Sequence, residues 1–191
     1  MKLHSLFFLF LAGLLTLTAC GDDDEAGPNN LTDDLLNYDG DNFASPELGP
    51  GRYEFAARFT ADELDPVRDK RLTAVQFFVV DRPQTLKVLV SGPNSATEPG
   101  NILFEFDLTN VGDIQERAFN ELPIDPPLAL PDEMWLSVEF ELDATAQNIG
   151  CDAGPADPNG DFLLDYNTGQ WQTFRQRTGE SVNWNIRGIL E

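Results

Sequence analysis

The chain has 191 residues, 33 of them acidic and 12 basic, and its formal net charge at pH 7 is -21. Binding to nucleic acid depends on Lys and Arg side chains that neutralise phosphates, so this balance argues against a nucleic-acid partner. Because 41% of the residues are hydrophobic and 14 are phenylalanine, the chain is too apolar to be disordered and can bury the core of one domain.

The first segment, residues 1–19, has the layout of a secretory signal peptide. A positive charge at Lys2 precedes an apolar run over 6–17, which is shorter than the ~20 residues needed to span a bilayer. Residues 17–20, Leu-Thr-Ala-Cys, resemble the lipobox of bacterial lipoproteins. This resemblance implies that Cys20 is lipidated, becomes the first mature residue and anchors the chain to the outer membrane. The anchor would be the only contact with the membrane.

The next segment, residues 20–37, is expected to be an acidic tether. It contains the run GDDDE at 21–25 and is too polar and too charged to fold. An acidic run directly after a lipidated cysteine also resembles the export signal of bacterial lipoproteins that are displayed outside the cell. A plain solvated spacer is the alternative, and the two are not exclusive. We therefore expect a cell-envelope protein that is exposed at the cell surface.

From about residue 38 onward, short alternating apolar and polar runs are separated by Gly, Pro and Asn. Period two with β-branched and aromatic residues is typical of strands with one buried face. The expected strands are 53–60, 75–79, 86–90, 102–108, 134–142, 162–166 and 182–188. The stretch DYNTGQW at 165–171 predicts a hairpin turn.

A helix start is indicated at Thr60–Glu63, a capping box, and Pro66 ends that helix within two turns. Many short strands without alternating helices predict an all-β fold for residues 38–191. The expected architecture is a jelly-roll-like sandwich of two antiparallel sheets with at most one short helix.

Histidine and cysteine are nearly absent. The only histidine is His4, inside the expected signal, so the mature chain lacks the residue on which Ser-His-Asp and Cys-His nucleophilic schemes and His-ligated zinc depend. The only other cysteine is Cys151, so no intrachain disulfide forms if Cys20 is acylated. Cys151 is expected to be a small buried hydrophobe. A reactive thiol is the alternative, but no His or Lys lies nearby in sequence to lower its pKa.

A candidate calcium loop lies at residues 157–161, Asp-Pro-Asn-Gly-Asp. Asp157, Asn159 and Asp161 have the opening spacing of a calcium loop, and Asp152 and Asp165 could add ligands. However, the glycine is misplaced and no glutamate closes the loop. The same residues form a strong type I turn signal, which is the expectation. No cofactor is expected, with calcium as the alternative.

Two sets of residues are candidates for ligand binding. On the outward face of 134–142, Trp135 could stack on a sugar ring while Glu139 bonds its hydroxyls. Alternatively, Trp135 packs under a loop or into a second small cluster. On the last strand, Asn183, Asn185 and Arg187 point the same way and form either a polar binding strip or a set of partners for loop carbonyls. Paired carboxylates, as in glycosidases, stand in no recognisable motif.

Five stretches carry a resemblance to a known class of module. They are YEFAARFTADEL (53–64), KRLTAVQFFVVD (70–81), MWLSVEFEL (134–142), CDAGPADPNGDFLLDYNTGQWQTF (151–174) and NWNIRGIL (183–190). In this order they resemble a β-sandwich module that accompanies peptidases and adhesins in secreted bacterial proteins. The resemblance implies binding or adhesion and transfers no catalytic residue.

The functional expectation is a non-catalytic surface lipoprotein that binds a glycan or another extracellular partner. The alternative is a structural or assembly subunit that docks on another envelope protein. An enzyme is the third choice and would need an acid pair at short separation in a deep cleft.

Overall fold

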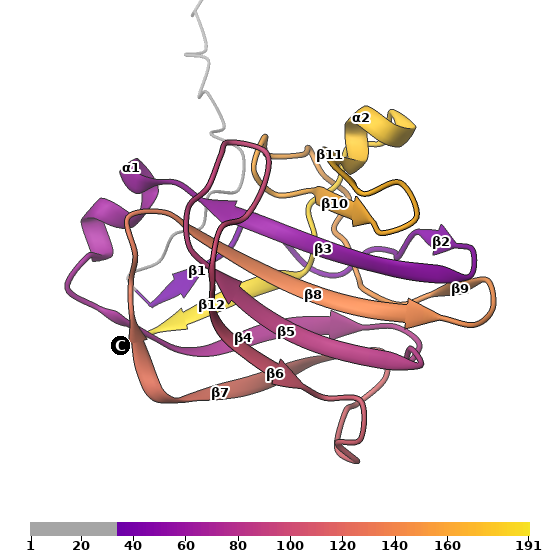
Figure 1. The fold of residues 1–191 in the computed structure, drawn as a ribbon, viewed down its shortest axis with the longest axis horizontal. Coiled ribbons are helices and arrows are strands. Elements are labelled where there is room, and N and C mark those ends of the chain that lie inside the picture. The colour runs from indigo at the N-terminus through magenta and orange to yellow at the C-terminus, as the bar shows by residue number, and fades with distance from the viewer. Residues whose placement is uncertain (1–33) are drawn as a thin grey trace, which may run out of the picture.

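The computed structural model describes residues 34–191. The predicted signal peptide, the predicted lipidation site at Cys20 and most of the predicted tether lie outside the described residues. Two antiparallel sheets pack face to face (Figure 1). The larger sheet has, in spatial order, β11 (Gln170–Thr173), β10 (Phe162–Asp165), β3 (Gly51–Phe59), β8 (Met134–Leu142), β5 (Thr85–Ser91) and β6 (Ile102–Asp107).

The smaller sheet consists of β1 (Leu35–Leu36), β12 (Ile186–Leu190), β4 (Arg71–Val79) and β7 (Ala118–Ala129). A separate pair joins β2 (Glu47–Leu48) to β9 (Ala146–Gln147). Three short helices, α1 (Ala61–Leu64), η1 (Asp65–Val67) and α2 (Phe174–Thr178), lie in the connections. The prediction of an all-β, two-sheet antiparallel sandwich is confirmed, although α2 is a second short helix where at most one was expected. Among residues 34–191, no helix has the length and apolarity needed to cross a bilayer.

The core lies between the sheets and follows from the alternation along β3 and β8. Phe55 is paired with Val138 across these strands, and both side chains are fully buried. The ring of Trp184 stacks on Phe55 with ring centroids 3.9 Å apart, and Trp184 is 1% exposed. At Gly188 the sheets approach closely: a Cβ there would lie 2.9 Å from Leu72 Cδ1 and 3.1 Å from Leu136 Cδ1. Any larger residue at this position of β12 would therefore have to displace these two leucine side chains.

The helix predicted to start at Thr60 and the hairpin predicted at residues 165–171 are both confirmed. In α1, Thr60 and Glu63 form the capping box, and η1 follows directly. β10 and β11 form the predicted hairpin, in which Gly169 takes a positive φ of 66°. A second capping box, Thr173 with Gln176, begins α2. That Thr-x-x-Gln spacing was visible in the sequence and could have predicted this helix.

Three expectations about the strands were wrong. Leu35–Leu36 pairs with β12 and Leu36 is fully buried, so the fold begins inside the segment expected to be tether. β7 was not expected, because its prolines hide the alternation. In β6 the strand is correct, but Ile102 and Phe106 are 53% and 43% exposed instead of buried. β6 is the outermost strand of its sheet, and the smaller sheet leaves it largely uncovered.

Candidate functional site

A polar groove of about 300 Å³ lies on the outer face of the larger sheet, the face turned away from the core. Cross-strand pairing creates it: Glu139 on β8 lies opposite Glu54 on β3 and opposite Lys87 on β5. The loop between β5 and β6 contributes Pro99 to its wall. We call this site the outer-face groove; its charged and aromatic side chains are Arg52, Glu54, Lys87, Glu105, Glu139, Tyr166 and Trp171.

Two carboxylates in the groove share one tyrosine hydroxyl. Tyr166 Oη lies 2.7 Å from Glu139 Oε2 and 3.0 Å from Glu54 Oε2, so its proton is donated to one carboxylate at a time. Both glutamates are only 6% exposed. Burial raises the pKa of Glu54 above its usual range, so Glu54 takes up a proton more readily than an exposed glutamate.

Arginine and lysine balance most of this negative charge. Arg52 Nη2 donates to Glu139 Oε2 at 2.6 Å, and the guanidinium lies over the Tyr166 ring, 4.2 Å from its centroid. Lys87 Nζ lies 2.8 Å from Glu105 Oε1. The groove therefore offers fixed donors and acceptors in a nearly neutral arrangement, which suits a ligand with several hydroxyls better than an ion of either sign.

Trp135 is not an exposed stacking platform, and that expectation was wrong. It is fully buried and packs with Phe162 and Trp171, at centroid distances of 4.7 and 5.9 Å. The alternative, a second small cluster, is confirmed. Phe162 and Trp171 come from the β10–β11 hairpin and cover Trp135 on the same outer face. Trp171 remains partly exposed and lines the groove, so Trp171 is the aromatic side chain at the binding face that was sought in Trp135. Glu139 lies in the groove, as expected.

The strip formed by Asn183, Asn185 and Arg187 is internal, so its interpretation as a binding surface was wrong. Asn183 and Asn185 are fully buried, and their amides donate to the carbonyls of Pro155 and Gly40, at 3.0 and 3.2 Å. Arg187 Nη2 also donates to the Gly40 carbonyl, at 2.8 Å. The alternative, that these side chains satisfy loop carbonyls, is confirmed.

The candidate calcium residues do not converge. Asp157 Oδ1 accepts the Asn159 amide at 2.8 Å, and the Gly160 amide bonds the Asp157 carbonyl at 3.1 Å, which makes the segment the expected turn. Asp152 Oδ1 accepts two backbone amides, including that of Asn183 at 2.7 Å. Asp161 is fully buried and bonds a backbone amide at the start of α2. Within the described part of the chain, no three acidic, histidine or cysteine residues are placed to hold a metal ion.

Cys151 is a buried side chain, as expected. It is 3% exposed, and burial raises the pKa of its thiol to about 12. A thiol with this pKa is almost entirely protonated at neutral pH, so it is a poor nucleophile.

Sequence reasoning missed most of the charged and aromatic side chains of the groove. Arg52 and Glu54 lie in the outward phase of the strand at 53–60, opposite the acids of 134–142, so pairing these two strands would have indicated them. Tyr166 and Trp171 flank the hairpin turn and enter the groove because β10 pairs with β3. No local pattern predicts that pairing.

Asp161 makes stability depend on pH. Its Oδ1 has no hydrogen-bond partner among the described residues, and burial raises its pKa from 3.8 to about 6. The folded state therefore binds this proton more tightly than the unfolded state, and its contribution to stability is lost as pH rises from about 4 to 6. The free energy of unfolding should therefore fall between about pH 4 and 6. We expect this fall to be up to ~3 kcal/mol smaller in Asp161→Asn.

The measurement for Asp161 is urea unfolding at intervals from pH 4 to 7. Glu54 and Asp157 also have raised pKa values and leave a residual slope in the variant. Equal slopes for the variant and the unsubstituted chain would show that Asp161 is not the group that titrates.

Comparison with known proteins identifies the fold alone. No protein-family model matches the sequence, and no curated protein matches it. A solved structure of a variant of the clostridial cysteine protease Cwp84, after propeptide cleavage, is similar with a TM-score of 0.56 and 12% sequence identity. The match covers 84% of this chain but only 41% of the protease chain, so this chain spans less than half of that protein. The resemblance to modules that accompany peptidases is thus supported at the level of fold.

Proposed function

We propose that this protein is a non-catalytic binding module whose outer-face groove holds a neutral glycan. The observation that carries the proposal is the arrangement of Tyr166, Glu54 and Glu139 beside the partly exposed Trp171. Carboxylates and a guanidinium can bond the hydroxyls of a sugar, while an indole edge contacts its apolar face. On the sequence features of residues 1–37, the module would be displayed at the cell surface by a lipid at Cys20.

Binding fits the carboxylate pair better than hydrolysis does. Glycosidases place two carboxyl groups on either side of the scissile bond, so that one protonates the leaving oxygen while the other acts at the opposite face. Glu54 and Glu139 come from neighbouring strands and lie side by side on one face of a sheet. Arg52 and Tyr166 both donate to Glu139 Oε2, so this carboxylate is held against the sheet by two donors.

The experiment is a glycan array probed with residues 20–191 carrying Cys20→Ser, run with calcium and again with a chelator. We expect a reproducible glycan hit that is independent of calcium. Tyr166→Phe removes only the bridging hydroxyl and should weaken binding about tenfold, as expected for hydrogen bonds to charged groups. Trp171→Ala should weaken it by roughly threefold to tenfold.

Glu54→Gln tests the groove, and Glu121→Gln is its matched control. Glu54 lies in the groove, whereas Glu121 is exposed on β7 of the other sheet. Only Glu54→Gln should reduce binding, with both variants folded by circular dichroism. A blank array under both conditions, or a hit that is insensitive to all three groove variants, would rule out this site.

A further inference from the structure

The free edge of the larger sheet is a second surface with a distinct chemistry. β6 ends the strand order, and no described strand pairs with its far side. Its side chains include Ile102, Leu103 and Phe106, which are 53%, 46% and 43% exposed. An exposed edge strand with apolar side chains is a template for pairing with another strand.

The other sheet edges are short or protected. β7, the edge of the smaller sheet beside it, contains Pro123, Pro126 and Pro127, and proline blocks strand addition. At the opposite ends, β1 has two residues and β11 has four. β6 has six residues and no proline. Among the edge strands described, β6 is therefore the one that is neither very short nor interrupted by proline.

The backbone of β6 is oriented for a new partner. The amide of Leu108 donates to the Leu86 carbonyl at 2.8 Å, which makes 86 and 108 a hydrogen-bonded pair. Antiparallel pairing alternates, so Phe106 bonds β5 through its backbone, while the backbone groups of Glu105 and Asp107 point away from the sheet.

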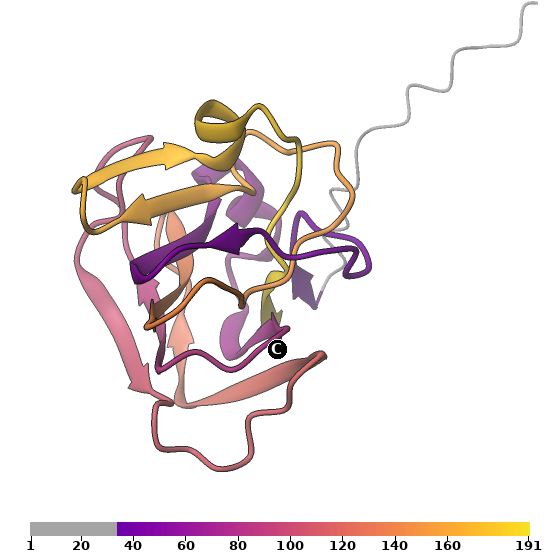
Figure 2. The same ribbon diagram turned by 90° about the vertical axis from the view of Figure 1, so that its right-hand side faces the viewer.

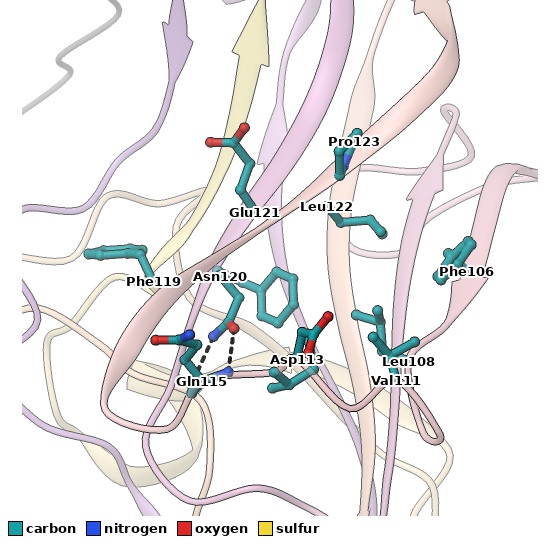
Figure 3. Close-up of a pocket in the computed structure, with 12 residues that line it drawn as sticks. Phe106, Leu108, Val111, Asp113, Gln115, Phe119, Asn120, Glu121, Leu122 and Pro123 are labelled. Carbon is teal, nitrogen blue, oxygen red and sulfur yellow. Dashed lines mark hydrogen bonds between the residues drawn. The ribbon is translucent and has the colours of Figure 1, made fainter.

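An apolar pocket of about 480 Å³ opens beside this edge (Figure 3). It lies between the edges of the two sheets, so Phe106 faces the sandwich interior and yet remains exposed. Leu122 on β7 points toward Phe106 and Leu108 across it (Figure 3). The apolar lining includes Phe77, Phe106, Leu108, Val111, Ile114 and Leu122.

Hydrogen bonds fix the loop at the rim of the pocket. Arg82 Nη2 donates to the carbonyls of Thr109 and Val111, at 3.1 and 2.6 Å. Asn120 Oδ1 accepts the Gln115 amide at 2.7 Å, and its Nδ2 donates to the Gln115 carbonyl at 2.9 Å. The 108–117 loop lies with β7 at the end of the molecule opposite the β10–β11 hairpin (Figure 2).

Charge selects the occupant of this edge. The outward side chains of β6 include Glu105 and Asp107, and Asp113 is exposed at the pocket. A second copy of this acidic chain would bring its own acids against these, which like-charge repulsion opposes. Lysine or arginine at alternate positions of an incoming strand would instead complement them.

We propose that β6 is a strand-addition site for an extended segment of a partner protein in which basic residues alternate with large apolar ones. The segment pairs with the backbone of Glu105 and Asp107. Its basic side chains face the outer acids, and one apolar side chain enters the pocket beside Phe106. This mode combines backbone pairing for affinity with alternate side chains for specificity. The site shares Glu105 with the outer-face groove, but it does not rest on the proposed glycan binding there.

The probe is a blocked heptapeptide, Lys-Val-Lys-Phe-Lys-Val-Lys, compared with its Glu-Val-Glu-Phe-Glu-Val-Glu counterpart, titrated against residues 20–191 carrying Cys20→Ser. Fluorescence anisotropy measures affinity, and hydrogen exchange locates binding. We expect the basic peptide to bind at least about tenfold more tightly, less so at high salt, and to protect the amides of Glu105 and Asp107.

Variants separate the two parts of the site. Glu105→Pro removes an outward amide and should abolish binding, whereas Glu105→Gln should weaken it only about threefold. Phe106→Ala should weaken binding, and Phe43→Ala, at the most exposed large apolar side chain, should not. Equal affinity for both peptides, no binding, or insensitivity to Glu105→Pro would overturn the proposal. Dimerisation through β6 without peptide, measured by analytical ultracentrifugation, would also overturn it.

Discussion

Asp39→Ala should lower the free energy of unfolding by about 3 kcal/mol, the low end of the range for breaking a buried ion pair. Asp39 is 1% exposed. Its two carboxylate oxygens accept hydrogen bonds from Arg187 Nε, at 2.9 and 3.0 Å, and Oδ2 also accepts one from the side-chain amide of Asn185. Without the carboxylate, Arg187 keeps only the Gly40 carbonyl, Gln76 Oε1 and the face of a neighbouring aromatic ring. The largely buried guanidinium is then left without a counter-charge.

The control for Asp39 is Asp132→Ala. Asp132 pairs with Arg68 at 3.2 Å, but its side chain is 93% exposed, and exposed pairs contribute ~0–1 kcal/mol. Urea unfolding at pH 7 measures both losses. Equal losses would mean that the Asp39 network is not what joins the N-terminal segment to β12. If the network does act in this way, adding Arg187→Met to Asp39→Ala should restore part of the lost free energy of unfolding, because it removes the unpaired charge. No recovery in the double variant would contradict the network's role.

Trp184→Ala should cost roughly 3–5 kcal/mol, the usual loss for a large aromatic side chain in a core. Trp184 is 1% exposed, stacks on Phe55, and meets Phe174 with ring centroids 5.2 Å apart. Its Nε1 donates to the Phe162 carbonyl at 2.7 Å, so the substitution also removes the partner of a buried acceptor. One side chain thus joins β3, β10 and α2.

Trp171→Ala is the matched comparison for Trp184, because the same atoms are removed from a partly exposed site. Its expected loss is below ~2 kcal/mol. Urea midpoints compared at equal m-values measure the difference. A Trp171 loss as large as that of Trp184 would place the structural centre of the fold at the hairpin cluster instead of between the sheets.

The sequence predicted the fold where local pattern and tertiary environment agree. Along β3 and β8, alternation predicted the strands and their core-facing side chains, because each strand has a partner on both sides. It did not predict that most of the outward side chains of these strands are buried as well. β6 has the same alternation but lies at an edge, and no local pattern reports where a sheet ends. β7 carries prolines that an edge strand tolerates, so its sequence resembles a loop.

The candidate site was predicted less well, because it depends on which strands are neighbours. Glu139 was found from its outward phase, but phase alone left Trp135 open between an exposed and a packed position, and the β10–β11 hairpin covers it. Asn183, Asn185 and Arg187 were expected on one strand face, but β12 begins only at Ile186. The side chains of these three residues instead bond the segments around Gly40 and Pro155. The phase along a strand shows that a side chain points away from the core. It does not show whether another segment of the chain covers that side chain.

The outer-face groove is tested most directly by following the three indole N–H resonances during titration with the glycan selected on the array. The account predicts that the Trp171 signal moves most, that Trp135 behind it moves less, and that Trp184 between the sheets stays in place. An unmoved Trp171 signal under saturating glycan, with shifts elsewhere, would contradict the assignment of the groove as the binding site.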